Sequence, residues 1–135
     1  MMISFDTNAL VRMLIEDNED QAKIVKGAVA LSESNSTQII ILLEVLIETV
    51  WVLESVYNCS RKEISLFLDI LASTPTFYIP DSTVLRPAIG QYKSGGDFAD
   101  LIIVGQAKRF HAQKLLSFDK KLQKKFPSFV VGKVL

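Results

Sequence analysis

The chain has 135 residues, 49% of them hydrophobic, and its 15 basic and 15 acidic residues leave no net charge that would indicate a partner. A chain of this length and apolar fraction is predicted to form a single domain over residues 1–135 around an ordinary buried core. The lone Cys59 excludes an internal disulfide, no apolar run approaches the roughly 20 residues of a membrane span, and no signal-peptide pattern opens the chain, so we expect a cytoplasmic protein.

The first half of the chain alternates short apolar runs with segments in which apolar residues recur at helical spacing. In chain order, these patterns predict a strand at residues 2–5, helices at 10–15 and 18–31, a polar break at 32–36, a strand at 39–42, and helices at 43–57 and 61–72.

The second half continues the alternation. It predicts a strand at residues 76–79, a helix at 84–92 with Pro87 in its first turn, a glycine turn at 94–96, a helix at 97–110, a strand at 114–116, a helix at 120–125 and a strand at 129–131. Strands that alternate with helices and are buried on both faces predict an α/β fold with a central parallel sheet flanked by helices. The glycine turn lacks the spacing of a dinucleotide-binding loop, which argues against a Rossmann-type cofactor.

The C-terminal part of the chain is basic although the whole chain is neutral. From Gly105 onward the single acid is Asp119, and the basic residues are Lys108, Arg109, Lys114, Lys120, Lys121, Lys124, Lys125 and Lys133. Such a segment is able to bind phosphates. A lysine-rich helix face in contact with solvent is the other interpretation, and charge alone favours it.

Two aspartates follow predicted strands. Ligands of an open parallel sheet bind at the carboxyl ends of its strands, and Asp6 lies at such an end. Asp119 opens onto the same edge if its strand, which contains Leu115 and Leu116, neighbours the first strand. Helix capping explains each aspartate equally well, because both precede predicted helices.

Glu48 lies in a predicted helix with few polar positions. Because burial of an unpaired carboxylate is costly, we expect Glu48 to have a partner. Glu44 lies one turn earlier on nearly the same face, where like charges repel unless a cation lies between them. An exposed stripe of Glu44, Glu48 and Ser55 is the alternative.

Asp97 and Asp100 open the helix after the glycine turn. Asp97 suits the capping position, and Asp100 lies in the positively polarised first turn. Because Asp100 projects one turn further into the helix, it is the stronger candidate for a site residue.

The candidate acids indicate metal chemistry. Asp6, Glu48, Asp100 and Asp119 supply the oxygen ligands that Mg²⁺ and Mn²⁺ prefer, and no cluster of Cys and His favours zinc. A catalytic triad would need His111, the only histidine, whose place near a predicted helix end suggests a surface or capping residue.

Four segments of the chain resemble, in order and at suitable spacing, the acidic motifs of PIN domains. They are residues 3–11 (ISFDTNALV), 48–53 (ETVWVL), 96–103 (GDFADLII) and 116–119 (LSFD). The second and third strings are similar to those of VapC-type toxins in particular. Ser117 departs from the threonine that is frequent at its position in the family, and Glu44 competes with Glu48 for the second acidic place.

The resemblance implies a metal-dependent endoribonuclease in which Asp6 and Asp100 are the principal ligands of Mg²⁺ or Mn²⁺ and Glu48 and Asp119 complete a catalytic pocket at the sheet edge. Thr7, Asn8, Asp97 and Ser117 would support these acids. The lysines at 120, 121, 124 and 125 would hold the RNA backbone. It further implies a homodimer and a small VapB-like antitoxin partner.

Two other functions stay open. A phosphatase that uses an aspartate nucleophile is the nearest enzymatic alternative, but its pattern requires a second aspartate where Asn8 stands. A non-catalytic PIN-like binding module, in which the acids only cap helices, is the alternative from another class. The distances between the four carboxylates discriminate, because wide separation of all four would exclude the nuclease.

Overall fold

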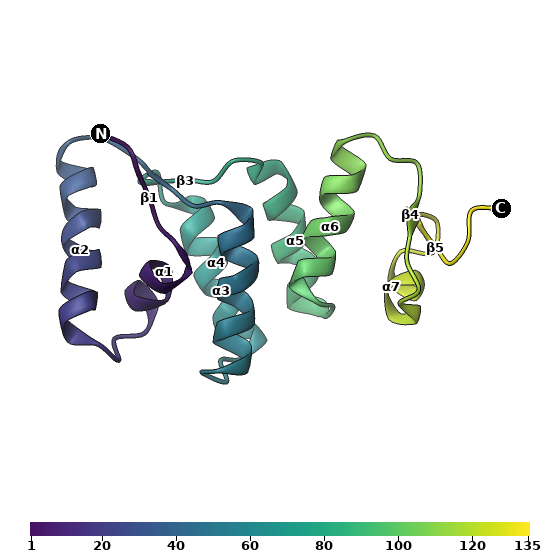
Figure 1. Cartoon of the computed structure of the whole chain (residues 1–135), viewed down its shortest axis with the longest axis horizontal. Coiled ribbons are helices and arrows are strands. Elements are labelled where there is room, and N and C mark those ends of the chain that lie inside the picture. The colour runs from purple at the N-terminus through teal and green to yellow at the C-terminus, as the bar shows by residue number, and fades with distance from the viewer.

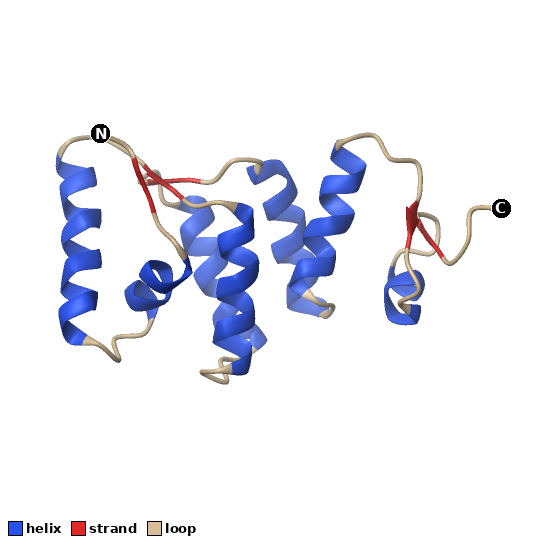
Figure 2. Ribbon diagram, viewed as in Figure 1, coloured by secondary structure: helices blue, strands red, loops and turns tan.

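The computed structural model describes residues 1–135 as short strands alternating with helices (Figure 2). In chain order the elements are β1 (Ile3–Ser4), α1 (Thr7–Leu14), α2 (Glu19–Ser34), β2 (Ile39–Ile40), α3 (Leu43–Ser55), α4 (Arg61–Ser73), β3 (Phe77–Tyr78), α5 (Ser82–Ser94), α6 (Phe98–Arg109), β4 (Leu115–Leu116), α7 (Lys120–Lys125) and β5 (Val130–Val131). The predicted α/β class is confirmed. No helix is long and apolar enough to cross a bilayer.

The strands form two separate parallel sheets. The first has the order β1–β2–β3, with Ile3 opposite Ile39 and Ile39 opposite Phe77. The second contains only β4 and β5, with Leu115 opposite Val130. Each strand is connected to the next through at least one helix, as parallel pairing requires.

The two sheets lie at different places along the molecule. Figure 1 shows β4, β5 and α7 at the C-terminal end of the long axis, with α5 and α6 between them and the sheet that contains β1. The condition under which Asp119 would share an edge with Asp6 is therefore not met. The reason lies in packing: Leu122 of α7 and Val130 of β5 form a small apolar cluster with Val104 of α6, which attaches this unit to α6.

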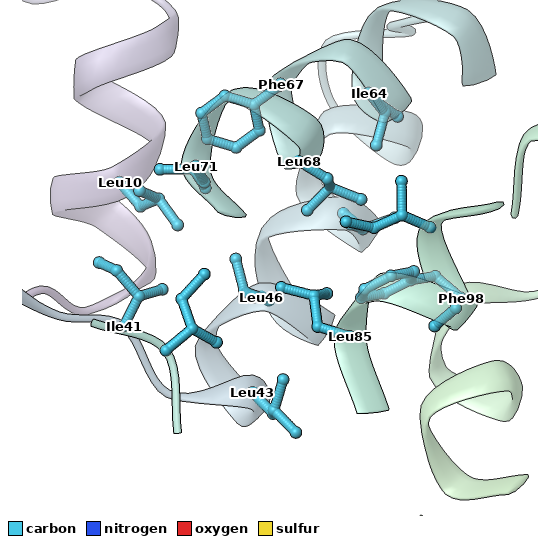
Figure 3. Close-up of a cluster of buried hydrophobic side chains, with 14 of the residues drawn as sticks. Leu10, Ile41, Leu43, Leu46, Ile64, Phe67, Leu68, Leu71, Leu85 and Phe98 are labelled. Carbon is cyan, nitrogen blue, oxygen red and sulfur yellow. The ribbon is translucent and has the colours of Figure 1, made fainter. Parts of the chain in front are cut away.

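The main core lies where α1, α3, α4 and α5 meet the first sheet. A cluster of 22 buried side chains fills this region, and Leu10, Leu46, Leu68 and Leu85 in it are completely inaccessible to solvent. Figure 3 shows these leucines together with Phe98, the first residue of α6. Burying a leucine contributes about 1.5–3 kcal/mol, so this cluster fixes the first turn of α6 against the rest of the domain.

Several element boundaries differ from the sequence prediction by a few residues, and two of these differences change how a predicted break is read. Helix α2 continues to Ser34, through much of the predicted polar break, and buries Ser32. Helix α5 begins at Ser82, so Pro87 lies inside the helix and not in its first turn. Pro87 has no N–H to donate to the carbonyl of Thr83, one turn earlier, and both residues are exposed.

Candidate functional site

Asp6 ends the first strand and caps α1. Its Oδ1 accepts a 2.9 Å hydrogen bond from the backbone N–H of Ala9, while Oδ2 accepts none, so the capping interpretation is correct and still leaves one oxygen available. The next residue, Thr7, donates its hydroxyl to Oε2 of Glu48 at 2.8 Å. Asn8 makes no side-chain hydrogen bond and is exposed.

Glu48 has a partner in Thr7, but it is exposed to solvent and not buried in its helix. The apolar surface of α3 is taken by Leu46, Val50 and Leu53, which leaves Glu44 and Glu48 on the exposed side. Of these two glutamates, only Glu48 contacts the segment that follows β1.

Asp97 and Asp100 lie at the start of α6, as predicted. Oδ2 of Asp97 accepts a 3.0 Å hydrogen bond from the backbone N–H of Asp100 and caps the helix. The preceding Gly95 and Gly96 have φ angles of 132° and 101°, which only glycine adopts easily. Partial burial, followed by the charges of Asp97 and Asp119, raises the pKa of the Asp100 carboxyl above its ordinary range.

Asp119 caps α7. Its Oδ1 accepts hydrogen bonds from the backbone N–H groups of Lys121 and Leu122 at 2.9 and 3.1 Å, while Oδ2 is free. The hydroxyl of Ser117 accepts a 3.1 Å hydrogen bond from the N–H of Asp119, which gives Ser117 the supporting contact expected of it.

The last three aspartates of the chain and three of the four predicted lysines share one cleft of about 470 Å³. Its charged lining consists of Asp97, Asp100, Asp119, Lys121, Lys124 and Lys125. Lys125 also donates a 2.9 Å hydrogen bond to the carbonyl of Gly95 and so links α7 to the turn before α6. Lys120 is not part of the lining. The cleft therefore combines carboxylate oxygens with a basic border.

A second, smaller pocket shares Asp97 with this cleft and is also lined by Glu48. It measures about 210 Å³ and is lined by Glu48, Trp51 and Glu54 from α3 and by the first residues of α6, including Asp97. Since Asp97 lines both hollows, it lies at the junction between them. The sequence interpretation, which assigned Asp97 a supporting role, did not anticipate this central place.

The structure thus arranges the candidate acids in two groups and not in one cluster. Asp6 and Glu48 are joined through Thr7, whereas Asp100 lies beside Asp97 and Asp119. No three Asp, Glu, His or Cys side chains lie close enough together to hold a metal ion. The placement of β4, which pairs with β5 and not with β1, accounts for the separation of Asp119 from Asp6.

Asp97, Asp100 and Asp119 do not enclose an ion by themselves, but their oxygens are ligands of the kind that Mg²⁺ uses together with substrate. Mg²⁺ keeps several of its own waters and is commonly held by one or two carboxylates together with substrate phosphates. Asp100 accepts no hydrogen bond through its side chain, and its pKa is raised partly by the charges of Asp97 and Asp119, a repulsion that a cation relieves.

Two residues near the cleft were not predicted from the sequence as site residues. Arg61 donates to the carbonyl of Gly96 from α4, a contact between positions 35 apart in the chain. Phe118 directly precedes Asp119 and is 81% exposed. The aromatic residue between Ser117 and Asp119 was the available clue to Phe118, whereas nothing local marks Arg61.

Comparison with known proteins gives one match. The sequence model of a family described as the PIN domain matches residues 3–126. No curated protein and no solved structure matches the chain significantly. The family match includes all four acidic segments and most of the chain, and the protein therefore belongs to the PIN domain family.

Proposed function

We propose that the protein is an endoribonuclease that depends on Mg²⁺ or Mn²⁺, and that residues 1–135 act as one PIN-like domain in the cytoplasm. PIN domains are generally nucleases that use divalent metal ions, and they typically bind RNA. The observation that carries the proposal is the cleft in which Asp97, Asp100 and Asp119 lie beside Lys121 and Lys124.

Asp100 and Asp119 are the proposed metal ligands of this cleft, and Asp6 and Glu48 extend the acidic surface on the other side of Asp97. The caps leave one free oxygen on Asp6, Asp97 and Asp119, so binding a cation does not require breaking the hydrogen bonds that begin the helices. A bound Mg²⁺ or Mn²⁺ would supply a water of lowered pKa and neutralise the clustered carboxylates.

The basic border and Phe118 suit unpaired RNA. Lys121 and Lys124 lie where a backbone phosphate would approach Asp100 and Asp119. The exposed ring of Phe118 offers a flat surface on which an unstacked base can lie, as in other proteins that bind single strands. A stiff duplex cannot present its bases in this way, so looped or single-stranded RNA is the proposed substrate.

A non-catalytic RNA-binding PIN module is the second candidate. Asp6, Asp97 and Asp119 each cap a helix, and no group of three acids is close enough to hold a metal ion. These observations favour a module that binds RNA through its lysines and uses its acids for folding.

Cleavage of a structured RNA and of a matched duplex DNA, with Mg²⁺ or Mn²⁺ and with EDTA, separates the two candidates. The nuclease cuts RNA loops only with metal, and Asp100→Asn loses cleavage while it retains RNA binding. Asp69→Asn is the matched control, because Asp69 pairs with Lys93 on the α4–α5 surface and does not line the cleft. Binding without cleavage by the wild type supports the module, and preference for duplex DNA contradicts the proposed substrate.

The finer biological role is the toxin of a toxin–antitoxin pair, with a small VapB-like antitoxin as partner. Its support is the similarity of residues 48–53 and 97–100 to VapC-type toxins. Induced expression should arrest growth, Asp100→Asn should not, and co-expression of a short neighbouring reading frame should restore growth. Normal growth of cells that express active wild-type nuclease would contradict the toxin role alone.

A further inference from the structure

The glycine turn that begins α6 is held by an arginine from another helix. Nη1 of Arg61, the first residue of α4, donates hydrogen bonds to the carbonyl of Tyr92 at 2.9 Å and to the carbonyl of Gly96 at 2.8 Å. The side chain of Arg61 therefore binds both the C-terminal part of α5 and the residue immediately before Asp97.

The ring of Tyr92 forms the support for this arginine. The guanidinium carbon of Arg61 lies 4.2 Å from the centre of the Tyr92 ring, a favourable cation–π distance. Tyr92 is completely buried, and its ring meets that of Phe98 edge to face at 5.7 Å. Because Phe98 is the first residue of α6, the same ring also fixes the helix that carries Asp100.

The hydroxyl end of Tyr92 is hydrogen-bonded to α3, the helix that also carries Glu48. Its hydroxyl donates a 2.6 Å hydrogen bond to Oε2 of Glu54 on α3. Burial, followed by the bond to Glu54, strongly raises the pKa of Tyr92, so the phenol keeps its proton and remains the donor. Arg61, Tyr92 and Glu54 thus connect α4, α5 and α3 beside the pocket that Glu48 and Asp97 both line.

The turn needs such support because its backbone has no intrinsic preference for one orientation. Gly95 and Gly96 both have positive φ angles and bear no side chain to pack. The carbonyl of Gly96 is fixed by Arg61, and that of Gly95 by Lys125. Without Arg61, the peptide before Asp97 would be free to rotate, and the Asp97 cap would be displaced with it.

We propose that Arg61 is a positioning residue, which rests on the proposed function: through Tyr92 and Glu54 it fixes Asp97 and Asp100 relative to the helix of Glu48 and so sets the metal affinity of the site. Residues that orient metal ligands from outside typically change metal affinity by about 10- to 100-fold when they are replaced. Arg61 touches neither metal nor substrate in this role.

The test is Mn²⁺ affinity measured by calorimetry on the full chain, together with the melting temperature without metal. Arg61→Met should weaken Mn²⁺ binding by about tenfold or more. Arg86→Met is the matched control, because Arg86 donates a similar 2.9 Å bond to the carbonyl of Ala72 from α5 to α4 but does not line the acidic cleft. The Arg86→Met variant should have a lower melting temperature than wild type and an unchanged Mn²⁺ affinity.

Further variants keep the outcome decisive. If Arg61→Met fails to fold, Arg61→Lys retains the charge but not the stacked, planar group, and it should still bind Mn²⁺ more weakly than wild type. Tyr92→Phe removes only the bond to Glu54 and should cause a smaller loss of affinity. Wild-type Mn²⁺ affinity in Arg61→Lys, or equal affinity in Arg61→Met and Arg86→Met, overturns the positioning role. If Asp100→Asn binds Mn²⁺ like wild type, the proposed metal site itself fails, whatever the Arg61 variants show.

Discussion

The hydroxyl of Thr7 donates a 2.8 Å hydrogen bond to Oε2 of Glu48, which joins the beginning of α1 to the middle of α3. This bond is the direct link between the first two acidic segments, and it leaves Oε1 of Glu48 free.

Thr7→Val keeps the shape of the side chain and removes the donor. A single hydrogen bond of this kind contributes about 1 kcal/mol, so we expect a small loss of stability in urea unfolding. The loss of RNA cleavage should be larger than this change explains, because Glu48 then loses the hydrogen bond that orients its carboxylate. Thr37→Val, which removes a hydroxyl bound to the carbonyl of Ser32, is the control. If Thr7→Val and Thr37→Val reduce RNA cleavage equally, Thr7 has only a structural role.

Asp100→Asn is expected to stabilise the metal-free protein. Burial and the charges of Asp97 and Asp119 raise the pKa of Asp100 in the folded chain. Below the ordinary aspartate pKa of about 3.9, the group is protonated in both states and has no effect. As pH rises through the ordinary pKa toward the raised one, the unfolded chain releases its proton first, so stability falls, and the full penalty is present above the raised pKa.

The melting temperature of metal-free Asp100→Asn should therefore exceed that of wild type at pH 7, with the difference disappearing below the ordinary aspartate pKa. Added Mn²⁺ should raise the melting temperature of wild type and not of the variant. Asp69→Asn, which breaks the ion pair with Lys93, should shift the neutral-pH value the other way or not at all. A metal-free variant less stable than wild type at pH 7 would mean that Asp100 is already neutralised within the protein.

Local patterns predicted the elements but not the partner of β4. Periodicity identifies Leu115 and Leu116 as a strand because the signal lies within a few residues. Whether that strand pairs with β1 or with β5 depends on the packing of Leu122 and Val130 against Val104, which involves distant parts of the chain. For this reason, the position of Asp119 relative to Asp6 could not be predicted from local sequence patterns.

The candidate acids show a second limit. Capping and metal binding were treated as alternatives for Asp6 and Asp119, but each cap uses only one carboxylate oxygen. The structure confirms the capping role, whereas the metal-binding role stays a prediction. The sequence had no means to show that one carboxylate can serve both. The contact of Arg61 with Tyr92 spans 31 positions and leaves no periodic trace, so the support of the glycine turn emerged only from the structure.

Lys121 and Lys124 should account for much of the salt dependence of RNA binding. For single strands, the slope of log affinity against log salt changes by about 0.7 for each phosphate contact, so Lys121→Gln with Lys124→Gln should reduce it by about 1.4. Mn²⁺ affinity should be retained. Lys23→Gln with Lys26→Gln changes the charge equally on α2, at the opposite end of the molecule (Figure 1). If the salt slope changes equally in both double variants, the effect comes from the overall charge of the protein and not from lysines at the cleft.

A homodimer is expected through the exposed face of α4. Leu66 and Ile70 are 61% and 54% exposed there, and Lys62 and Asp69 lie on either side of Leu66. Antiparallel packing of two α4 helices about a two-fold axis near Leu66 would bring Lys62 toward Asp69 of the partner subunit. Asp69 is already paired with Lys93 of its own chain, so the apolar contact of Leu66 and Ile70 is the main source of the expected association. Sedimentation at micromolar concentration should give a dimer, and Leu66→Lys a monomer. Leu31→Lys, at a similarly exposed leucine on α2, should remain dimeric. A monomeric wild type would remove this interface.

Phe118→Ala should weaken binding of single-stranded RNA selectively. The ring is 81% exposed beside Asp119, and stacking on such a ring contributes about 1–3 kcal/mol per base. Phe110→Ala is the matched control, since Phe110 is 74% exposed but follows the far end of α6 from Asp100. Fluorescence titration with a single-stranded RNA, and with the same RNA annealed to its complement, should show a loss only for the single strand and only in Phe118→Ala. Because stacking requires an unpaired base whereas the lysines contact any backbone, the salt dependence should stay unchanged. Equal losses in the two variants, or a loss that duplex RNA shares, would mean that Phe118 contributes general apolar surface and leaves the choice of substrate to the cleft.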